Sequence, residues 1–406
     1  MIKKINSTHF LSLLILSSFL LRLAAVYFFR DTHIDNEWNI LLKNLINYQS
    51  YSYYEFSGLL IPSVYMPPIY AVFLYLVKLI TTFDGAHLVY SIIFIQVVLS
   101  TYTIYLFYEL NKFFFTNNIS LINSFIFSSI PLNIYACGQI SSINLQMIFS
   151  LLFLKYLLLI AKKENFKNIC IFSITTGLLI MTRGEFILIF FLIFIFIFLS
   201  KKIKPSSGIK IIIIITLVIS PYLTRNYYHF NQIFIVKSLG YNLWKGNNEL
   251  SKVEGYENLE KIEFKDLKSQ VESLKKNKYY EINRDDIFLN KAINNISENP
   301  IHYIGLFFTK FFSYYFVDLN SNYPNYYNLF HIFPIILVSI LSFPGLFFFS
   351  KTKKFNNKCV VLYLFSNLII FSLFFVLPRY KLIILPVQII LATYFIKFII
   401  EKYESK

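Results

Sequence analysis

The stretch FILIFFLIFIFIFL, residues 186–199, is followed after a short linker by IKIIIIITLVI, residues 209–219. Both blocks are apolar on every side rather than along one stripe. The linker between them holds Lys201, Lys202 and Lys204. Unbroken apolar blocks with basic flanks are typical of membrane spans and not of amphipathic helices on a soluble core. These residues therefore predict a membrane protein that crosses the bilayer several times.

The composition of the whole chain agrees with this prediction. Of the 406 residues, 56% are hydrophobic and 15% are charged, whereas a soluble domain carries about 25% charged residues. So few charges cannot cover a water-facing surface, which excludes a soluble enzyme and a disordered protein. The three cysteines, Cys137, Cys170 and Cys359, lie in or beside apolar segments and match neither a disulfide framework nor a zinc spacing.

The formal net charge of +16 does not indicate nucleic-acid binding. The lysines fall in short clusters between apolar blocks, where the positive-inside rule places cytoplasmic loops. The N-terminal run contains no small-residue cleavage site before Phe29, so we expect an uncleaved first helix with Lys3 and Lys4 inside.

The number of spans is predicted from the side of the membrane on which the basic clusters should lie. Ten spans are predicted, at 9–29, 86–110, 119–136, 143–161, 168–182, 185–200, 208–224, 329–350, 359–377 and 382–400. With ten spans, Lys112 and the clusters at 162–167, 201–204 and 351–358 all face the cytoplasm. If either of the apolar stretches 67–83 and 301–317 crossed the membrane, basic clusters that follow it would move to the outside. We therefore expect both stretches to be interfacial helices on the outer surface.

The predicted class is thus an all-α polytopic membrane protein in three parts. Residues 1–225 form an N-terminal membrane module with an external loop at 30–85. Residues 226–300 form an external loop, and residues 301–406 form an interfacial helix followed by the last spans. The polar stretch 249–286 contains ten acidic and eight basic residues, and Leu259, Ile262, Leu267, Val271 and Leu274 in it fall near helical spacing. It predicts a small external helical insert.

Two carboxylates and an imidazole lie just past the outer end of the first span, at His33, Asp35 and Glu37. A carboxylate at the boundary between water and lipid suits a general base, although a solvated loop start would have the same composition. The three side chains are also of types that bind a divalent metal. No cofactor is required by the sequence, and a metal remains an open alternative.

Several cations at external turns break the positive-inside rule. Arg183 lies in the TRGE turn, Arg225 ends the seventh span, and Arg379 and Lys381 flank Tyr380 in a four-residue hairpin. Arg183 could simply pair with Glu185, but guanidinium groups also suit phosphate oxygens. Beyond Arg225, the segment GYNLWKGNN (240–248) is rich in turn residues and amide donors suited to sugar hydroxyls, with Asn242, Trp244 and Asn247 as the candidates for substrate binding.

A single kind of site would explain both the carboxylates of the first loop and the cations at the external turns. The acid of the first loop would take a proton from an acceptor hydroxyl, and the external cations would stabilise a phosphate that leaves a sugar. A leaving group with an isoprenoid tail would explain why the site is built against the bilayer.

These residues resemble the C-type (GT-C) membrane glycosyltransferases, in particular bacterial protein O-mannosyltransferases and the lipid A aminoarabinose transferase. The resemblance rests on Asp35, on Pro67-Pro68 with Tyr70, on the TRGE turn, on RNYYHFNQIFIV…GYNLWKGNN and on PRYKLIILP. It implies a polyprenyl-phosphate-linked sugar as donor, inversion at the anomeric carbon and an active site on the external face of a bacterial inner membrane. It implies Asp35 as the catalytic base with Glu37 as a second carboxylate. It also implies that Arg183, Arg225, Arg379, Tyr380 and Lys381 lie near the donor phosphate.

Two other readings remain open at this stage. A surface-polysaccharide polymerase or ligase would also have about ten spans and a large external loop. A transporter or flippase for a lipid-linked saccharide would want external cations, but no internal repeat supports it. The sequence does not choose between a protein, a lipid and a glycan as acceptor.

Overall fold

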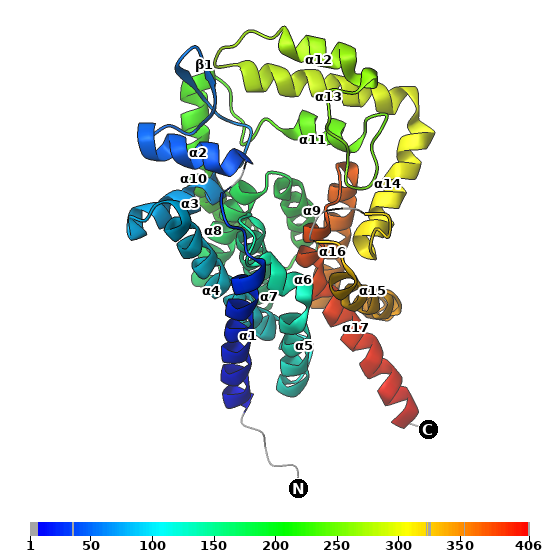
Figure 1. The fold of residues 1–406 in the computed structure, drawn as a ribbon. Helices are drawn as coiled ribbons and strands as arrows, with labels where there is room; N and C mark the ends of the chain where they lie inside the picture. The colour runs from blue at the N-terminus through cyan, green and yellow to red at the C-terminus, as the bar shows by residue number, and fades with distance from the viewer. Residues whose placement is uncertain (1–6, 35, 322, 324–325, 353, 405–406) are drawn as a thin grey trace.

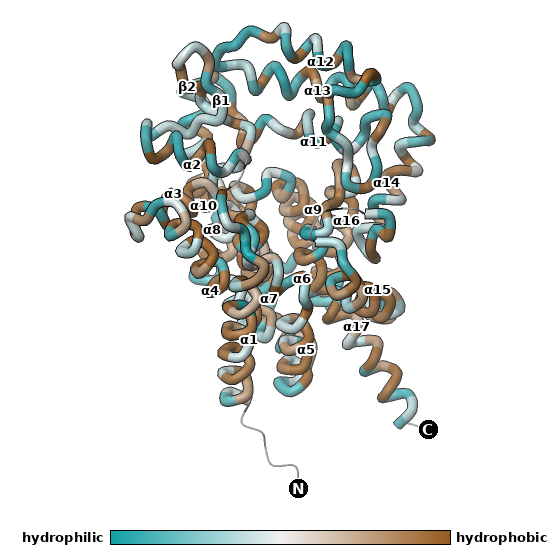
Figure 2. The backbone as a smooth tube through the Cα atoms, viewed as in Figure 1, coloured by the Kyte–Doolittle hydropathy of each residue, from teal (hydrophilic) through white to brown (hydrophobic). Residues whose placement is uncertain are grey.

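The structure is a computed structural model that describes residues 7–34, 36–321, 323, 326–352 and 354–404. It has two layers, a lower bundle of apolar helices and an upper polar cap (Figure 1). Hydropathy follows the same division, since the bundle helices are mostly hydrophobic and the cap is mostly hydrophilic (Figure 2). The first residues of α1 and the last residues of α17 lie on the side of the bundle opposite the cap.

The bundle is built from helices because a bilayer core offers no partner for a free backbone N–H or C=O. Its helices are α1 (Ser7–Phe29), α4 (Gly85–Asn111), α5 (Asn117–Ser129), α6 (Pro131–Ala136), α7 (Ile143–Lys162), α8 (Phe166–Thr182), α9 (Phe186–Leu199), α10 (Pro205–Phe230), α15 (Leu329–Ser350), α16 (Phe355–Leu373) and α17 (Lys381–Glu404). Within the described residues, α1, α4, α7, α10, α15, α16 and α17 are long and apolar enough to cross a membrane, while α8 and α9 are shorter apolar helices.

The predicted all-α membrane class is confirmed, and each of the ten predicted spans overlaps a helix, although the stretch 359–377 extends four residues past the end of α16 at Leu373. The stretch 119–136 is the one that is broken, into α5 and α6. Pro131 has no N–H and forces Ile130 into an extended conformation, with φ −66° and ψ 118°, so the helix ends before it. The prediction of ten crossings itself stays a prediction.

The basic clusters lie at the end of the bundle away from the cap. They occupy the loops between α7 and α8, between α9 and α10, and between α15 and α16. The opposite ends of these helices face the cap. Lys3, Lys4 and Lys353 lie outside the described residues.

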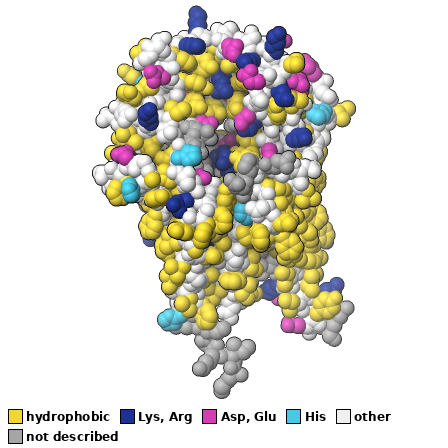
Figure 3. All heavy atoms as spheres, viewed as in Figure 1, with side chains coloured by type: hydrophobic (Ala, Val, Ile, Leu, Met, Phe, Trp, Pro, Cys, Tyr) yellow, Lys and Arg dark blue, Asp and Glu magenta, His cyan; other side chains and the backbone are white. Residues whose placement is uncertain are grey.

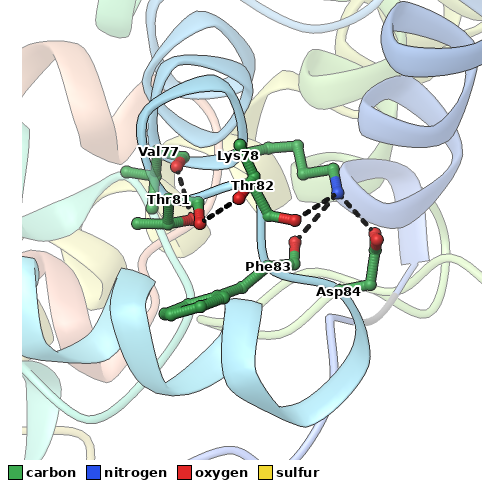
Figure 4. Close-up of polar contacts among 6 residues, drawn as sticks. All are labelled: Val77, Lys78, Thr81, Thr82, Phe83 and Asp84. Atoms are coloured by element: carbon green, nitrogen blue, oxygen red, sulfur yellow. Dashed lines mark hydrogen bonds and ion pairs between the residues drawn. The ribbon is translucent and has the colours of Figure 1, made fainter.

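The predicted interfacial helices are α3 (Pro68–Thr81) and α14 (Pro300–Tyr315). A compact turn separates α3 from α4 (Figure 4). Thr82 adopts a left-handed conformation with φ 57°, and the Lys78 ammonium donates to the carbonyls of Thr82 and Phe83 and to Asp84 Oδ1, at 2.7 Å from the last. The turn ends α3 and redirects the chain, so that α3 and α4 are two helices rather than one.

The cap contains α2 (Asn36–Tyr48), the strands β1 (Ser52–Phe56) and β2 (Leu59–Pro62), α11 (Leu239–Gly246), the 3-10 turn η1 (Ile262–Phe264), α12 (Lys265–Glu272) and α13 (Tyr280–Glu298). The antiparallel hairpin of β1 and β2 is a small exception to the all-α prediction. The apolar core of the cap gathers Trp244, Phe264, Leu267, Val271, Phe288 and Ala292.

The predicted helical insert is present as the short helix α12. Leu267 and Val271 are buried as expected, but Ile262 is 89% exposed, because the chain turns at η1 before the helix begins. The main helix of the cap, α13, was not predicted. Its buried positions 281, 282, 285, 288, 292 and 295 have helical spacing, but three of the six are polar, so a hydrophobic pattern does not reveal it.

A cluster of buried polar groups around Gly246, Asn247 and Lys310, which we call the polar knot, connects the cap to the bundle. The Asn247 side-chain amide donates to the carbonyls of Leu243 and Leu373, at 2.8 Å each. The Lys310 ammonium of α14 donates to the Gly246 carbonyl at 2.6 Å and to Asn247 Oδ1 at 3.0 Å. A Cβ on Gly246 would lie 1.9 Å from the Phe374 carbonyl oxygen, so only glycine permits this approach.

The Gly246→Ala substitution should loosen the contact between cap and bundle. The added Cβ would collide with backbone, and we expect a loss of about 1–3 kcal/mol in the free energy of unfolding, as for other overpacked sites. Thermal unfolding of the purified protein in detergent measures it. Gly305→Ala on α14 is the matched control, because its added Cβ meets open space. Equal unfolding temperatures for Gly246→Ala and wild type would contradict the close approach.

Lys310 should make the stability of the protein depend on pH. Burial lowers the pKa of Lys310 to about 7, whereas a lysine in an unfolded chain keeps a pKa of about 10.4. Between these values the unfolded chain binds more protons than the folded one, so the free energy of unfolding rises with pH. Thermal unfolding between pH 7 and pH 10 should show this rise in wild type and less of it in Lys310→Met. Lys291→Met, which removes a more exposed lysine paired with Glu249, should keep the wild-type slope; an unchanged slope in Lys310→Met would count against the prediction.

Candidate active site

A large cavity lies between the bundle and the cap, with a volume of about 1200 Å³. The space-filling view shows a hollow at this level, with basic and acidic side chains in it, above a lower half that is mostly hydrophobic (Figure 3). The bundle contributes the ends of α8 and α9 and the segment 374–380 between α16 and α17, which includes the 3-10 turn η2 (Pro378–Tyr380). The cap contributes α2, α11 and the segment 254–258. Segments more than 300 residues apart in the sequence therefore meet at one site.

Arg183 and Arg379 line the cavity from the bundle side. The Arg183 guanidinium lies 4.4 Å from the centre of the Tyr380 ring, and its Nε donates to Gln146 Oε1 at 3.2 Å. Among the described residues, neither arginine forms an ion pair with a carboxylate, so Arg183 is not paired with Glu185. Two cations thus face the same cavity, and no carboxylate of the described residues forms a direct ion pair with either of them.

Glu37 lines the cavity from the first turn of α2. Asp35, the predicted base, lies outside the described residues. His33 is exposed, and its Nδ1 lies 3.0 Å from Thr32 Oγ1. Within the part of the chain that the structure describes, no group of three His, Cys, Asp or Glu side chains is arranged to hold a metal ion. The predicted trio of His33, Asp35 and Glu37 includes a residue beyond that part, so the metal alternative stays a prediction.

The other predicted cations are engaged with backbone. Arg225 donates to the carbonyls of Ser63 at 2.7 Å and Tyr51 at 3.0 Å, which braces the loop around the hairpin. Lys381 is buried and donates to the carbonyls of Tyr314 and Tyr315, where it closes the C-terminal end of α14. In the structure both side chains hold the scaffold together.

The segment GYNLWKGNN divides into two sets of residues. Asn242 lines the cavity. Trp244 is fully buried in the core of the cap, and Asn247 belongs to the polar knot described above. Gly240 lies against α13, where an added Cβ would be 2.1 Å from the Asp285 carbonyl oxygen. Much of this segment therefore serves packing between the cap and its neighbours.

Other polar residues of the cavity were not selected from the sequence. They are Asp31, whose Oδ2 accepts from the Ile140 N–H at 2.6 Å, and Lys245, Glu254 and Glu257 on the cap side. Lys245 lay within the quoted GYNLWKGNN segment, and the two glutamates lay within the polar insert. The sequence offered no signal that distinguished these from the many solvated charges of the insert.

The fold and the sequence both have known relatives. Residues 66–224 match the family model described as dolichyl-phosphate-mannose-protein mannosyltransferase. The oligosaccharyltransferase AglB of Archaeoglobus fulgidus, in complex with an inhibitory peptide and a dolichol-phosphate, matches with a TM-score of 0.60 and 13% identity over 98% of this chain and 51% of that one. ArnT of Cupriavidus metallidurans bound to undecaprenyl phosphate matches with a TM-score of 0.56 and 10% identity, over 96% of this chain and 60% of that one. A comparison with curated protein sequences finds no match.

This chain spans about half of the length of AglB and three-fifths of that of ArnT. The structural matches establish a shared fold over nearly the whole of this chain. The resemblance to the C-type membrane glycosyltransferases is therefore confirmed, by the fold and by the family model over residues 66–224.

Arg225 and Arg379 should respond differently to truncation. Arg225→Ala leaves the carbonyls of Ser63 and Tyr51 without a charged donor, and we expect it to lower the free energy of unfolding by about 2 kcal/mol. Arg379→Ala removes an unpaired cation from a cavity, so it should leave stability unchanged or raise it. Thermal unfolding of the two variants beside wild type tests this. Equal destabilisation by both would show that Arg379 also supports the scaffold.

Proposed function

We propose that this chain, which has the fold of the C-type glycosyltransferases, is an inverting glycosyltransferase that moves a sugar from a polyprenyl-phosphate donor to a hydroxyl acceptor. The acceptor is a protein, a lipid or a glycan, and the reaction takes place at the outer face of a bacterial inner membrane. The observation that carries the proposal is the pair of unpaired arginines, Arg183 and Arg379, in a large cavity that borders the apolar bundle.

The arginine end of the cavity suits a lipid-linked phosphate. A guanidinium offers several N–H donors in a plane and matches phosphate oxygens. The contacts of Arg183 with Gln146 and Tyr380 hold its side chain in place before a ligand arrives. Next to a low-dielectric bundle, the attraction between a cation and a phosphate is stronger than in water. Two proteins with the same fold, AglB and ArnT, have been solved with a dolichol-phosphate and with undecaprenyl phosphate, respectively.

The carboxylates of the first loop supply the base in this proposal. Asp35 takes the proton from the acceptor hydroxyl, whose oxygen attacks the anomeric carbon of the sugar. The bond between that carbon and the phosphate oxygen breaks, and the negative charge that builds up on the phosphate is stabilised by Arg183 and Arg379. Glu37, on the cavity wall two residues further along, orients the hydroxyl. A single displacement of this kind inverts the configuration at the anomeric carbon.

The distribution of lysines supports an external site. The cavity lies at one end of the bundle, and the basic clusters of the short loops lie at the other. Short basic loops tend to face the cytoplasm, and this tendency supports a cavity on the outer side of the membrane. Polyprenyl-phosphate sugars with their head groups on that side are the matching donors.

Asp35→Asn and Arg379→Ala should separate chemistry from donor binding. We expect Asp35→Asn to abolish sugar release or transfer from a panel of undecaprenyl-phosphate monosaccharides while sparing donor affinity. Arg379→Ala should weaken binding of undecaprenyl phosphate about tenfold, as expected for the loss of a charge-assisted hydrogen bond.

Turnover and binding of the purified protein in detergent give both results. Lys237→Ala is the control, because it removes a cap lysine that pairs with Asp286 and should change neither. Equal turnover by wild type and Asp35→Asn would overturn the assignment of the base, and unchanged lipid affinity in Arg379→Ala would overturn the phosphate site.

A further inference from the structure

The cap wall of the cavity is formed by the segment 254–258, which belongs to the polar insert. The Val376 N–H donates to the Val253 carbonyl at 2.9 Å, so this segment is tied to the loop that leads to Arg379. Glu254, Tyr256, Glu257 and Asn258 all line the cavity. The insert therefore does more than cover the outside of the cap, because part of it faces the arginines.

Glu257 is held in a fixed position on this wall. Its Oε2 accepts a hydrogen bond from the Tyr241 hydroxyl at 2.9 Å and forms an ion pair with Lys245. Burial acts to raise the pKa of Glu257, but the hydrogen bonds from Lys245 and Tyr241 outweigh it and lower the pKa, so the carboxylate is ionised at neutral pH. Its second oxygen, Oε1, accepts no hydrogen bond from the described residues. A preorganised carboxylate thus keeps an acceptor oxygen available to a ligand in the cavity.

Lys245 is preorganised in the same way. Its side chain is 17% exposed, and its ammonium lies 4.9 Å from the centre of the Phe375 ring. An ammonium has three N–H donors, and the ion pair with Glu257 uses one of them. The pair therefore presents a donor and an acceptor side by side, with a net charge of zero.

The Glu257–Lys245 pair and the arginines Arg183 and Arg379 line the same cavity. Tyr323 lines the cavity together with Arg379 and Glu257. Burial raises the pKa of the Tyr323 phenol, Arg379 lowers it, and Glu254 and Glu257 raise it. The charge of Arg379 in the bundle and the charges of the two glutamates in the cap therefore act on the same Tyr323 phenol.

We propose that Glu257 and Lys245 bind hydroxyl groups of the sugar on the lipid phosphate and thereby select which sugar is transferred. This inference rests on the proposed function. A sugar linked directly to a phosphate at Arg379 must extend into the cavity, away from the bundle. A sugar hydroxyl donates and accepts hydrogen bonds, which matches the two members of the pair. Because Lys245 neutralises Glu257, the site suits a neutral hydroxyl better than a cationic amine.

Binding of lipids with and without a sugar tests the proposal directly. The probes are undecaprenyl phosphate and a panel of its mannosyl, glucosyl, galactosyl and aminoarabinosyl derivatives, with the full-length protein in detergent. The quantity of interest is the ratio of the Kd of the bare lipid phosphate to that of each glycosylated lipid. We expect wild type to prefer at least one neutral sugar. Glu257→Gln and Lys245→Met should each reduce that preference about tenfold, as for the loss of a hydrogen bond to a charged group, with the Kd of the bare lipid unchanged.

Glu260→Gln is the matched control. Glu260 belongs to the same insert and pairs with Lys268 in the same way, but unlike Glu257 it does not line the cavity. It should leave every Kd at the wild-type value. Tyr241→Phe, which removes one hydroxyl and no charge, should reduce the preference by less than Glu257→Gln does. Unfolding temperatures near wild type for all four variants show that they fold.

The outcomes separate this inference from the proposed function. A preference for the glycosylated lipid that survives in Glu257→Gln and Lys245→Met would overturn the sugar site and leave the lipid-phosphate site intact. A strongest preference for the aminoarabinosyl lipid would overturn the choice of a neutral hydroxyl. Binding of neither lipid by wild type would overturn the proposed function itself, whatever the variants do.

Discussion

The cavity exists because a buried polar knot holds the cap against the bundle. At its centre, Asn247 donates to the Leu373 carbonyl at the end of α16, and Lys310 donates to the Gly246 carbonyl. These groups are buried, and an unpaired buried polar group costs free energy, so each member depends on the others. These hydrogen bonds fix the position of α11 relative to α16. They thereby help to hold the two walls of the cavity opposite each other.

Second contacts fix the remaining side of the cap. On α13, Glu281 accepts from Ser63 Oγ at 2.9 Å and from the Val64 N–H at 2.5 Å, which ties the first external loop to the insert. Arg225 holds the same loop from α10 through the carbonyls of Ser63 and Tyr51. The segment that includes Tyr51, Ser63 and Val64 is thus held from both layers.

The arginines show how such a scaffold prepares a site for an anion. A cation near a low-dielectric bundle is normally neutralised by a carboxylate of the protein. Arg183 instead contacts the Tyr380 ring and the Gln146 amide, which position the guanidinium, and it forms no direct ion pair with a carboxylate of the described residues. On the cap side, Lys245 and Glu257 form an ion pair without net charge. The arginine end of the cavity is therefore suited to an anion, and the Lys245–Glu257 pair is suited to neutral polar groups.

Predictions from sequence were accurate where a pattern has one physical cause. Apolar blocks with basic flanks correctly predicted a polytopic helical membrane protein, since only helices satisfy the backbone in hydrocarbon over such lengths. The cations that break the positive-inside rule were less informative, because a cation that donates to carbonyls and one that faces a cavity look alike in sequence. Arg183 and Arg379 line the cavity, whereas Arg225 and Lys381 hold backbone.

The GYNLWKGNN segment shows the same limit. Its composition indicated sugar binding, yet Trp244 is in the core of the cap and Asn247 is in the knot, while Lys245 between them faces the cavity. Because α11 is a helix, its successive side chains point in different directions. Only the contacts with α13, α14 and α16 decide which of these side chains are buried and which line the cavity. The sequence by itself determined the membrane class and the helical architecture, because these follow from local hydropathy and charge. The tertiary structure alone decided which polar residues meet across the cavity, because their positions depend on contacts between segments far apart in the chain.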